Sequence, residues 1–281
     1  MREPSTWWRI LREAALAWVT HKASRLGAAL AYYSIFSLGP LMLITVAFAG
    51  LIFGEQAVRG ELTGRLASLL GEQGGRAVEF MLASAGRSPS GGILASIFGL
   101  ATLLLAAVGI VVQLKDALNT IWETDAPKRG AWGLLRTYAM AVAGVLVLGL
   151  LLLGTLMVTA ALSAMRDVLA PYLPMVVFHM LSFIVSLGVI ALTFAIAFKM
   201  LPDVQITWRD VLPGAVFTAV LFAIGSLLTG LYLGYQGLAS AYGAAASLVV
   251  LLVWMYYSAQ IILFGAEFTR VYMQARGRRV S

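Results

Sequence analysis

Residues 175–199 read MVVFHMLSFIVSLGVIALTFAIAFK, a run with no charged side chain before Lys199. A helix of about 20 apolar residues crosses the hydrocarbon core of a bilayer, which is about 30 Å thick. The run is continuous and lacks the alternation of apolar and polar residues typical of a membrane β-barrel strand. It therefore predicts a transmembrane helix.

Five further apolar runs have the same character, at 27–53, 92–114, 134–163, 211–235 and 243–264. A chain of 281 residues could form two soluble domains, but 60% hydrophobic and 12% charged residues exclude that class. Because backbone amides in hydrocarbon must be paired within their own segment, we expect an all-α polytopic membrane protein with six transmembrane helices. The expected organisation is a cytoplasmic interfacial helix at 1–26, a transmembrane domain at 27–266 and a basic cytoplasmic tail at 267–281.

The basic residues are distributed unevenly between the two sides of these runs. Counting Arg136 and Lys199 with their nearest ends, the segments before the first run, between the second and third, between the fourth and fifth, and after the last hold 15 of the 20 Lys and Arg residues. The positive-inside rule then predicts that both termini are cytoplasmic. The net charge of +7 is explained by this topology and by contact with anionic lipid headgroups, so we expect no nucleic-acid partner.

Two amphipathic regions lie outside the apolar runs. Trp7, Leu11, Ala14 and Trp18 recur at helical spacing, which predicts a helix lying on the inner leaflet. The outer loop at 54–91 is too long to be left unstructured and carries apolar stripes of its own. We expect amphipathic helices there that rest on the outer leaflet or cap the bundle; the alternative is a movable lid over a cavity.

Polar side chains within the first and last runs are candidates for the lining of a cavity. The tripeptide Tyr-Tyr-Ser occurs in both runs, at 32–34 and at 256–258. Polar groups in hydrocarbon are costly and often functional, although they also bridge packed helices by hydrogen bonds. Both interpretations stay open for the candidate residues, which are Tyr32, Tyr33, Ser37, Pro40, Tyr257 and Gln260.

A second group of candidates gathers at the cytoplasmic ends of the runs. Its members are Arg25, Lys115, Asp116, Asn119, Arg136 and Glu267. An unpaired carboxylate near hydrocarbon is expensive, so we expect Glu267 to be held by Lys115 or Arg136. The alternative is that Glu267 reaches headgroup water beside Arg270.

Signatures of catalysis are missing from the sequence. It contains no nucleophile elbow, zinc-protease motif or Walker A loop, and it has no cysteine. Its two histidines, His21 and His179, are predicted to lie near opposite faces of the bilayer. We therefore expect no enzyme activity, no catalytic residue, no cofactor and no metal site.

Several short motifs occur in an order typical of one family of bacterial inner-membrane proteins. They are Ala29-Leu30-Ala31-Tyr32-Tyr33-Ser34 through Ser37-Leu38-Gly39-Pro40, Leu118-Asn119-Thr120-Ile121-Trp122, Leu201-Pro202-Asp203, Trp208-Arg209-Asp210, Pro213-Gly214-Ala215, Tyr242-Gly243 and Gly265-Ala266-Glu267. The sequence resembles the YihY/BrkB family over essentially its whole length, with an extra Ala241 before Tyr242-Gly243. The resemblance implies six helices, an inner-membrane location and a role in transport, with no agreed substrate or catalytic residues.

Three functions follow as hypotheses. The first is an integral membrane transporter or lipid-handling permease, and the second is a structural or envelope-integrity protein that organises partners. Family members have carried virulence-factor and ribonuclease BN labels, so a membrane-bound ribonuclease is the third; the missing metal ligands disfavour it. The expected partners are membrane lipids, and a homo-oligomer stays open because Gly50-x-x-x-Gly54 and Gly230-x-x-x-Gly234 permit close helix approach.

Overall fold

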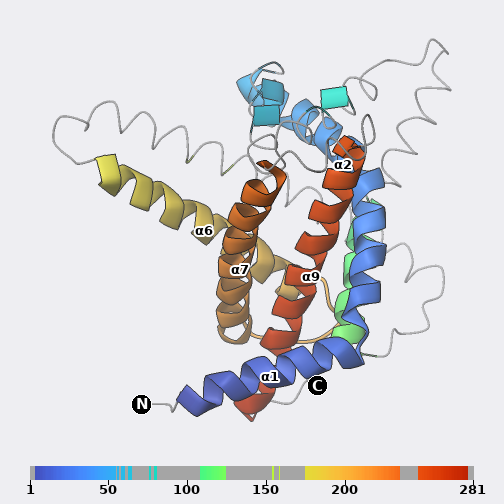
Figure 1. Cartoon of the computed structure of the whole chain (residues 1–281), viewed down its shortest axis with the longest axis vertical. Coiled ribbons are helices and arrows are strands. Elements are labelled where there is room, and N and C mark those ends of the chain that lie inside the picture. Colours follow the sequence, from blue (N-terminus) through green and yellow to red (C-terminus); the bar gives the residue numbers. More distant parts are fainter. Residues whose placement is uncertain are drawn as a thin grey trace.

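A computed structural model describes residues 4–54, 108–124, 175–234 and 246–277, with isolated residues or short pieces at 56, 58–60, 63–64, 76, 79–80, 154 and 158. All regular elements within these ranges are helices, and the described part of the chain contains no strand. The all-α prediction is confirmed for this part of the chain (Figure 1).

Four long helices coincide with predicted transmembrane runs. They are α2 (Ala23–Phe53), α6 (Met175–Met200), α7 (Trp208–Gly234) and α9 (Ala246–Ala275). The last three contain stretches long and apolar enough to cross a membrane, at Val176–Met200, Trp208–Leu228 and Val249–Ala275. Most of the predicted runs at 92–114 and 134–163, and most of the outer loop, lie outside the described residues, so the count of six stays a prediction.

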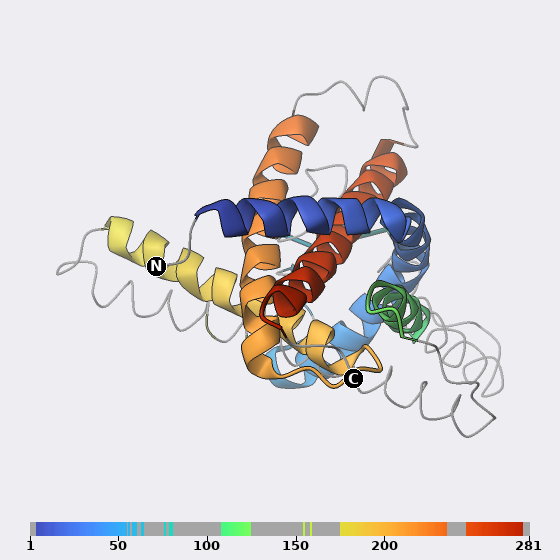
Figure 2. The ribbon, with the colours of Figure 1, turned by 90° about the horizontal axis from the view of Figure 1, so that it is seen from below.

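The helices α2, α7 and α9 stand side by side with a shorter helical segment at 108–121, whereas α6 leans away from them (Figure 1). The helix α1 (Pro4–Thr20) lies crosswise at one end of this bundle, as the view along the bundle shows (Figure 2). Its buried residues Ile10 and Ala14 pack against Phe268 and Tyr272 of α9. A helix is therefore present where the sequence predicts one.

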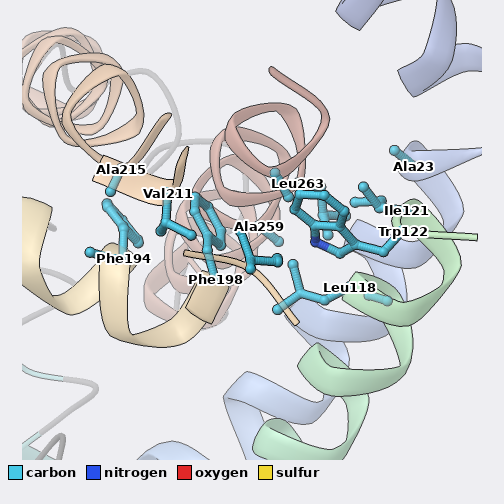
Figure 3. Close-up of a cluster of buried hydrophobic side chains, with 14 of the residues drawn as sticks. Ala23, Leu118, Ile121, Trp122, Phe194, Phe198, Val211, Ala215, Ala259 and Leu263 are labelled. Carbon is cyan, nitrogen blue, oxygen red and sulfur yellow. The ribbon is translucent and has the colours of Figure 1, made fainter. Parts of the chain in front are cut away.

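The bundle core lies between α6, α7, α9 and the segment 108–124 (Figure 3). Leu118, Ile121 and Trp122 enter it from that segment, and Phe194 and Phe198 enter it from α6. Lipid tails are as apolar as these side chains, so close van der Waals packing must supply most of the association energy between membrane helices. Small residues of the same cluster, such as Ala215 and Ala259, allow that close approach.

A reciprocal contact joins α7 to α9, and we call it the glycine–threonine seam. The pattern Gly-Ala-x-Phe-Thr occurs at 214–218 in α7 and again at 265–269 in α9. A β-carbon on Gly214 would lie 1.9 Å from Thr269 Oγ1, and one on Gly265 would lie 1.9 Å from Thr218 Oγ1. Each threonine hydroxyl donates at 2.7 Å to the carbonyl of the glycine four residues earlier in its own helix.

The phenylalanines of the two copies also meet across the seam. The ring centroids of Phe217 and Phe268 are 4.1 Å apart, and the ring planes are inclined by 21°. Small residues four apart that face each other across two helices are a common device for close packing in membranes. The seam is not a Gly-x-x-x-Gly pair, because threonine takes the second small position, and the glycine spacing in the sequence therefore does not predict it.

Candidate functional site

Four charged or ionisable side chains meet where α1 turns into α2, and we call them the corner cluster. His21 lies in the turn between these helices, and Glu123 lies in the turn that follows the segment 108–121. Glu267 and Arg270 are one helical turn apart near the end of α9. The cluster thus connects three parts of the chain at the end of the bundle that α1 crosses.

The side chain of His21 lies between two carboxylates. Its Nδ1 is 2.5 Å from Glu267 Oε1, and its Nε2 is 3.3 Å from Glu123 Oε1. Arg270 closes the ring, because its Nη1 donates to Glu123 Oε1 and its Nε lies 3.3 Å from Glu267 Oε2. His21 and Arg270 therefore each contact both carboxylates.

The cluster reaches from the protein interior to solvent. The side chain of Glu267 is 0% exposed and that of Arg270 is 9% exposed, whereas that of Glu123 is 64% exposed. The Arg270 guanidinium beside Glu123 holds the pKa of that carboxyl below its ordinary value. Burial opposes this effect, and His21 adds a smaller contribution in the same direction as Arg270. A fully buried carboxylate requires such partners, since removing it from water costs several kcal/mol.

The turns that carry two members of the cluster have unusual backbones. Glu123 has φ 53° and Lys22, the neighbour of His21, has φ 52°. This left-handed conformation costs a residue with a β-carbon roughly 1–2 kcal/mol. At Glu123 it ends the helical segment and turns the chain where the side chain meets Arg270.

A second polar group lies beside the corner cluster, and we call it the Asp203 node. Lys115 Nζ donates to Asp203 Oδ1 at 2.8 Å, and Asn119 Nδ2 donates to Asp203 Oδ2 at 3.0 Å. The Asp203 backbone N–H returns a hydrogen bond to Asn119 Oδ1 at 2.8 Å. Lys115 and Asn119, one turn apart, thereby fix the connection 201–207 between α6 and α7.

Glu267 is held by His21 and Arg270. The prediction that Lys115 holds Glu267 is wrong, because Lys115 pairs with Asp203 and Glu267 pairs with His21. The rival expectation is correct that Arg270 lies beside Glu267, but the carboxylate is buried and does not reach headgroup water. Arg136 lies outside the described residues.

Two other predicted members of the cytoplasmic group, Arg25 and Asp116, are exposed. Arg25 lies near the start of α2, and Asp116 follows Lys115 on the far side of its helix from the core. Asn119 is buried in the Asp203 node. The structure therefore divides the predicted group between a node built on Asp203 and a cluster built on His21.

The predicted cavity residues of α9 face two different helices. A β-carbon on Gly27 of α2 would lie 2.0 Å from Gln260 Nε2, and one on Gly225 of α7 would lie 2.5 Å from Tyr257 Cε1. Gln260 Nε2 also donates to the Ser24 carbonyl at 3.5 Å. Both side chains therefore take part in helix packing.

The predicted cavity residues of α2 divide in a similar way. Ser37 is fully buried, and its hydroxyl donates to the Ser34 carbonyl at 3.1 Å. Tyr32 is 59% exposed and Tyr33 is 42% exposed, while the side chain of Pro40 lies outside the described residues. A hydrated cavity between α2 and α9 stays a prediction.

Sequence reasoning misses three residues of these groups, namely His21, Glu123 and Asp203. Glu123 directly follows the motif that ends at Trp122, and Asp203 ends the motif Leu201-Pro202-Asp203. Their places in or beside these motifs could have marked both residues as candidates. Among the described residues there is no set of three or more His, Cys, Asp and Glu side chains placed to hold a metal ion.

Comparisons with known proteins identify a family and several membrane-protein relatives. The family description "Virulence factor BrkB" matches residues 15–281. A UPF0761 membrane protein of Pseudomonas aeruginosa strain LESB58 is 30% identical over 258 residues, which are 91% of this chain and 60% of that protein. A UPF0761 membrane protein of Azotobacter vinelandii is 27% identical over 262 residues, which are 92% of this chain and 61% of that protein.

The chain spans about three fifths of the length of these curated relatives. No solved structure matches it. The family match covers the corner cluster, the Asp203 node and the glycine–threonine seam alike. With its apolar helices and this match over most of its length, the chain belongs to the virulence factor BrkB family of membrane proteins.

Proposed function

We propose that the protein is an integral membrane transporter or lipid-handling permease whose substrate is still to be found. The observation that carries the proposal is the burial of Lys115, Glu267 and Arg270 between helices of a membrane protein. Ionisable groups at such positions are expensive and typically belong to the path of an ion or a polar substrate. The proposal includes no catalytic step.

We further propose that the end of the bundle crossed by α1 faces the cytoplasm, with both termini on that side of the bacterial inner membrane. The excess of Lys and Arg on this side supports the orientation. The exposed side chains Trp8, Leu16 and Val19 of α1 suit contact with lipid, and Arg9 and Arg12 suit anionic headgroups.

An envelope-integrity protein that organises partners is the second candidate. The glycine–threonine seam favours it, because helices packed this closely resist relative movement. A transporter must rearrange, so a rigid interior under all conditions supports the scaffold. The curated relatives are longer than the chain, and either proposal concerns the part described here.

Reconstitution into liposomes tests the transport proposal. The purified protein is placed in vesicles of phosphatidylethanolamine and phosphatidylglycerol that contain fluorescent lipid analogues, and dithionite bleaches the outer leaflet. We expect protein to expose inner-leaflet phosphatidylglycerol to bleaching, and we expect Asp203→Asn to slow this exposure at least several-fold. Vesicles carrying folded protein that neither move lipid nor pass small ions or solutes at any pH from 6 to 8 would rule out the proposal.

A further inference from the structure

We propose that the corner cluster is a proton-binding site in which one exchangeable proton, shared by His21 and Glu267, holds α1 against the rest of the bundle. The inference that this proton is the coupling ion rests on the transport function proposed above. The existence of the site does not depend on it.

The hydrogen-bond geometry around His21 favours a protonated ring. Each ring nitrogen of His21 lies against a carboxylate oxygen, Nδ1 at 2.5 Å from Glu267 and Nε2 at 3.3 Å from Glu123. Ionised carboxylates only accept hydrogen bonds, and a neutral imidazole has a single N–H to donate. With both carboxylates ionised, the doubly protonated ring is the form that satisfies both contacts.

The formal charges of the corner cluster balance when His21 is protonated. With His21 charged, the cluster holds two positive groups, His21 and Arg270, and two negative groups, Glu123 and Glu267, so its formal charge is zero. Release of one proton to water leaves a formal charge of −1 around a carboxylate that is 0% exposed. An uncompensated charge in such a place is strongly unfavourable unless the groups separate or become hydrated.

A proton can reach His21 from solvent. Glu123 is 64% exposed and contacts the outer nitrogen of His21, whereas Glu267 contacts the inner nitrogen. A proton can therefore enter from solvent at the Nε2 side without passing through the apolar core. The charged groups that the structure places against His21 are Glu267 of α9 and Glu123 of the segment 108–124, with Arg270 behind both; Lys22 and Arg25 on its own segment are exposed.

Loss of the proton weakens the joint between α1 and α2. His21 lies at the joint between α1 and α2, next to Lys22 with its left-handed backbone. The remaining contacts of α1 with the bundle include the packing of Ile10, Ala14 and Trp7 on α9 and of Trp18 against the bundle core. Loss of the proton weakens the joint while this packing remains, so α1 pivots about its contact with α9 and does not dissociate.

Two features of the sequence make the test clean. The chain has only two histidines and no cysteine, so ¹⁵N-histidine labelling gives two imidazoles, and engineered cysteines are the only thiols. His179→Gln assigns the signals. Spin labels at Ala15→Cys of α1 and Gln274→Cys of α9, both exposed positions, report the distance between these helices.

In lipid nanodiscs we expect both His21 nitrogens to be protonated at pH 6, and we expect one proton to be lost on alkalinisation together with a change in the spin-label distance. In Glu267→Gln, charging the His21 ring should require an about tenfold higher proton concentration, because an opposite charge at this distance favours the charged form. The distance should then no longer follow pH in the same range. Glu13→Gln, an exposed acid on α1, is the matched control and should change neither readout.

A neutral His21 ring at pH 6, or a ring whose charging is the same in Glu267→Gln, would overturn the site. A constant distance while the ring titrates would overturn its effect on α1. If both readouts behave as expected but vesicles show no transport, only the transport function fails. Transport that is unaffected by pH, in a protein with a neutral His21, would instead remove the proton from the mechanism.

Discussion

Gly214 of α7 faces Thr269 of α9 so closely that a β-carbon on the glycine would lie 1.9 Å from the threonine Oγ1 and 3.1 Å from its Cα. The second of these atoms belongs to the backbone and cannot rotate away. The two helices can adopt this separation only because glycine occupies position 214. The seam therefore makes the stability of the bundle sensitive to the addition of one methyl group.

We predict that Gly214→Ala lowers the free energy of unfolding by about 1–3 kcal/mol, the usual cost of overpacking. Gly27→Ala should cost less, because its added methyl group would meet only the end of the flexible Gln260 side chain. Gly188→Ala is the control: nothing lies within 4 Å of its β-carbon position in α6, so it should be neutral or slightly stabilising. Thermal unfolding in detergent checks the order, and equal costs for the three variants would contradict the seam.

A second prediction concerns the backbone at Lys22. Its φ of 52° is unfavourable for a residue with a β-carbon, and its side chain is exposed. Lys22→Gly should therefore stabilise the protein by up to about 1 kcal/mol, after allowance for the greater entropy of the unfolded glycine. Arg25→Gly, inside α2, should instead destabilise it by about 1 kcal/mol. A loss of stability in both variants would show that the turn between α1 and α2 does not hold this conformation.

The pH dependence of stability should report Glu123. Arg270 lowers the pKa of this carboxyl in the folded protein, so its contribution to stability is fully present above the unfolded value of about 4.3. The contribution is lost as the pH falls through the lowered folded-state value. We expect Glu123→Gln to reduce the melting temperature at pH 6, with a difference from wild type that shrinks as the pH falls below about 4.3.

The Glu123 effect should be small, because its side chain is 64% exposed and solvent screens the ion pair. Sodium chloride at 1 M should shrink it further. Glu13→Gln removes an exposed acid that pairs with Arg9 one turn away on the surface of α1, and it serves as the control. A difference at pH 6 that persists unchanged at pH 3 would assign the loss to something other than the charge of Glu123.

The topology prediction can be tested because the chain has no cysteine. Single cysteines at Ser5, Ser68 and Ser281 are treated with an impermeant thiol reagent on intact cells. We expect labelling at Ser68 alone, with Ser5 and Ser281 reacting only after permeabilisation. Labelling of Ser5 or Ser281 in intact cells would reverse the orientation and move the corner cluster to the outer side.

Much of the fold could be predicted because transmembrane helices are local features of a sequence. The runs that became α2, α6, α7 and α9 each carry enough apolar residues to span a bilayer without reference to the rest of the chain. The spacing of Trp7, Leu11, Ala14 and Trp18 likewise predicts a helix at the position of α1. The sequence holds this information within single segments.

The partners of the charged residues could not be predicted in the same way. Glu267 and His21 are 246 positions apart, and their contact depends on how α2 and α9 are rotated about their axes. Hydropathy does not encode that rotation, so any nearby base was an equal candidate. Asp203 was overlooked as a partner because it lies in a connection between helices, where an acid has water as an alternative.

The Asp203 node provides the sharpest test of these pairings. Lys115 is 5% exposed and Asp203 is 28% exposed in their side chains, so the two partners differ in what their removal leaves behind. Asp203→Asn leaves a buried ammonium without its carboxylate, which typically costs about 3–5 kcal/mol. Lys115→Met leaves a half-exposed carboxylate that Asn119 still binds, so we expect a smaller loss.

The double variant Lys115→Met with Asp203→Asn should cost less than the sum of the two single changes, because contacting residues are energetically coupled. Lys115→Met combined with Glu267→Gln should be additive within about 0.5 kcal/mol, since these residues belong to separate groups. Unfolding in detergent at pH 7 measures both cycles. Coupling between Lys115 and Glu267, with additivity between Lys115 and Asp203, would restore the pairing that sequence reasoning favours and would reject the division into node and cluster.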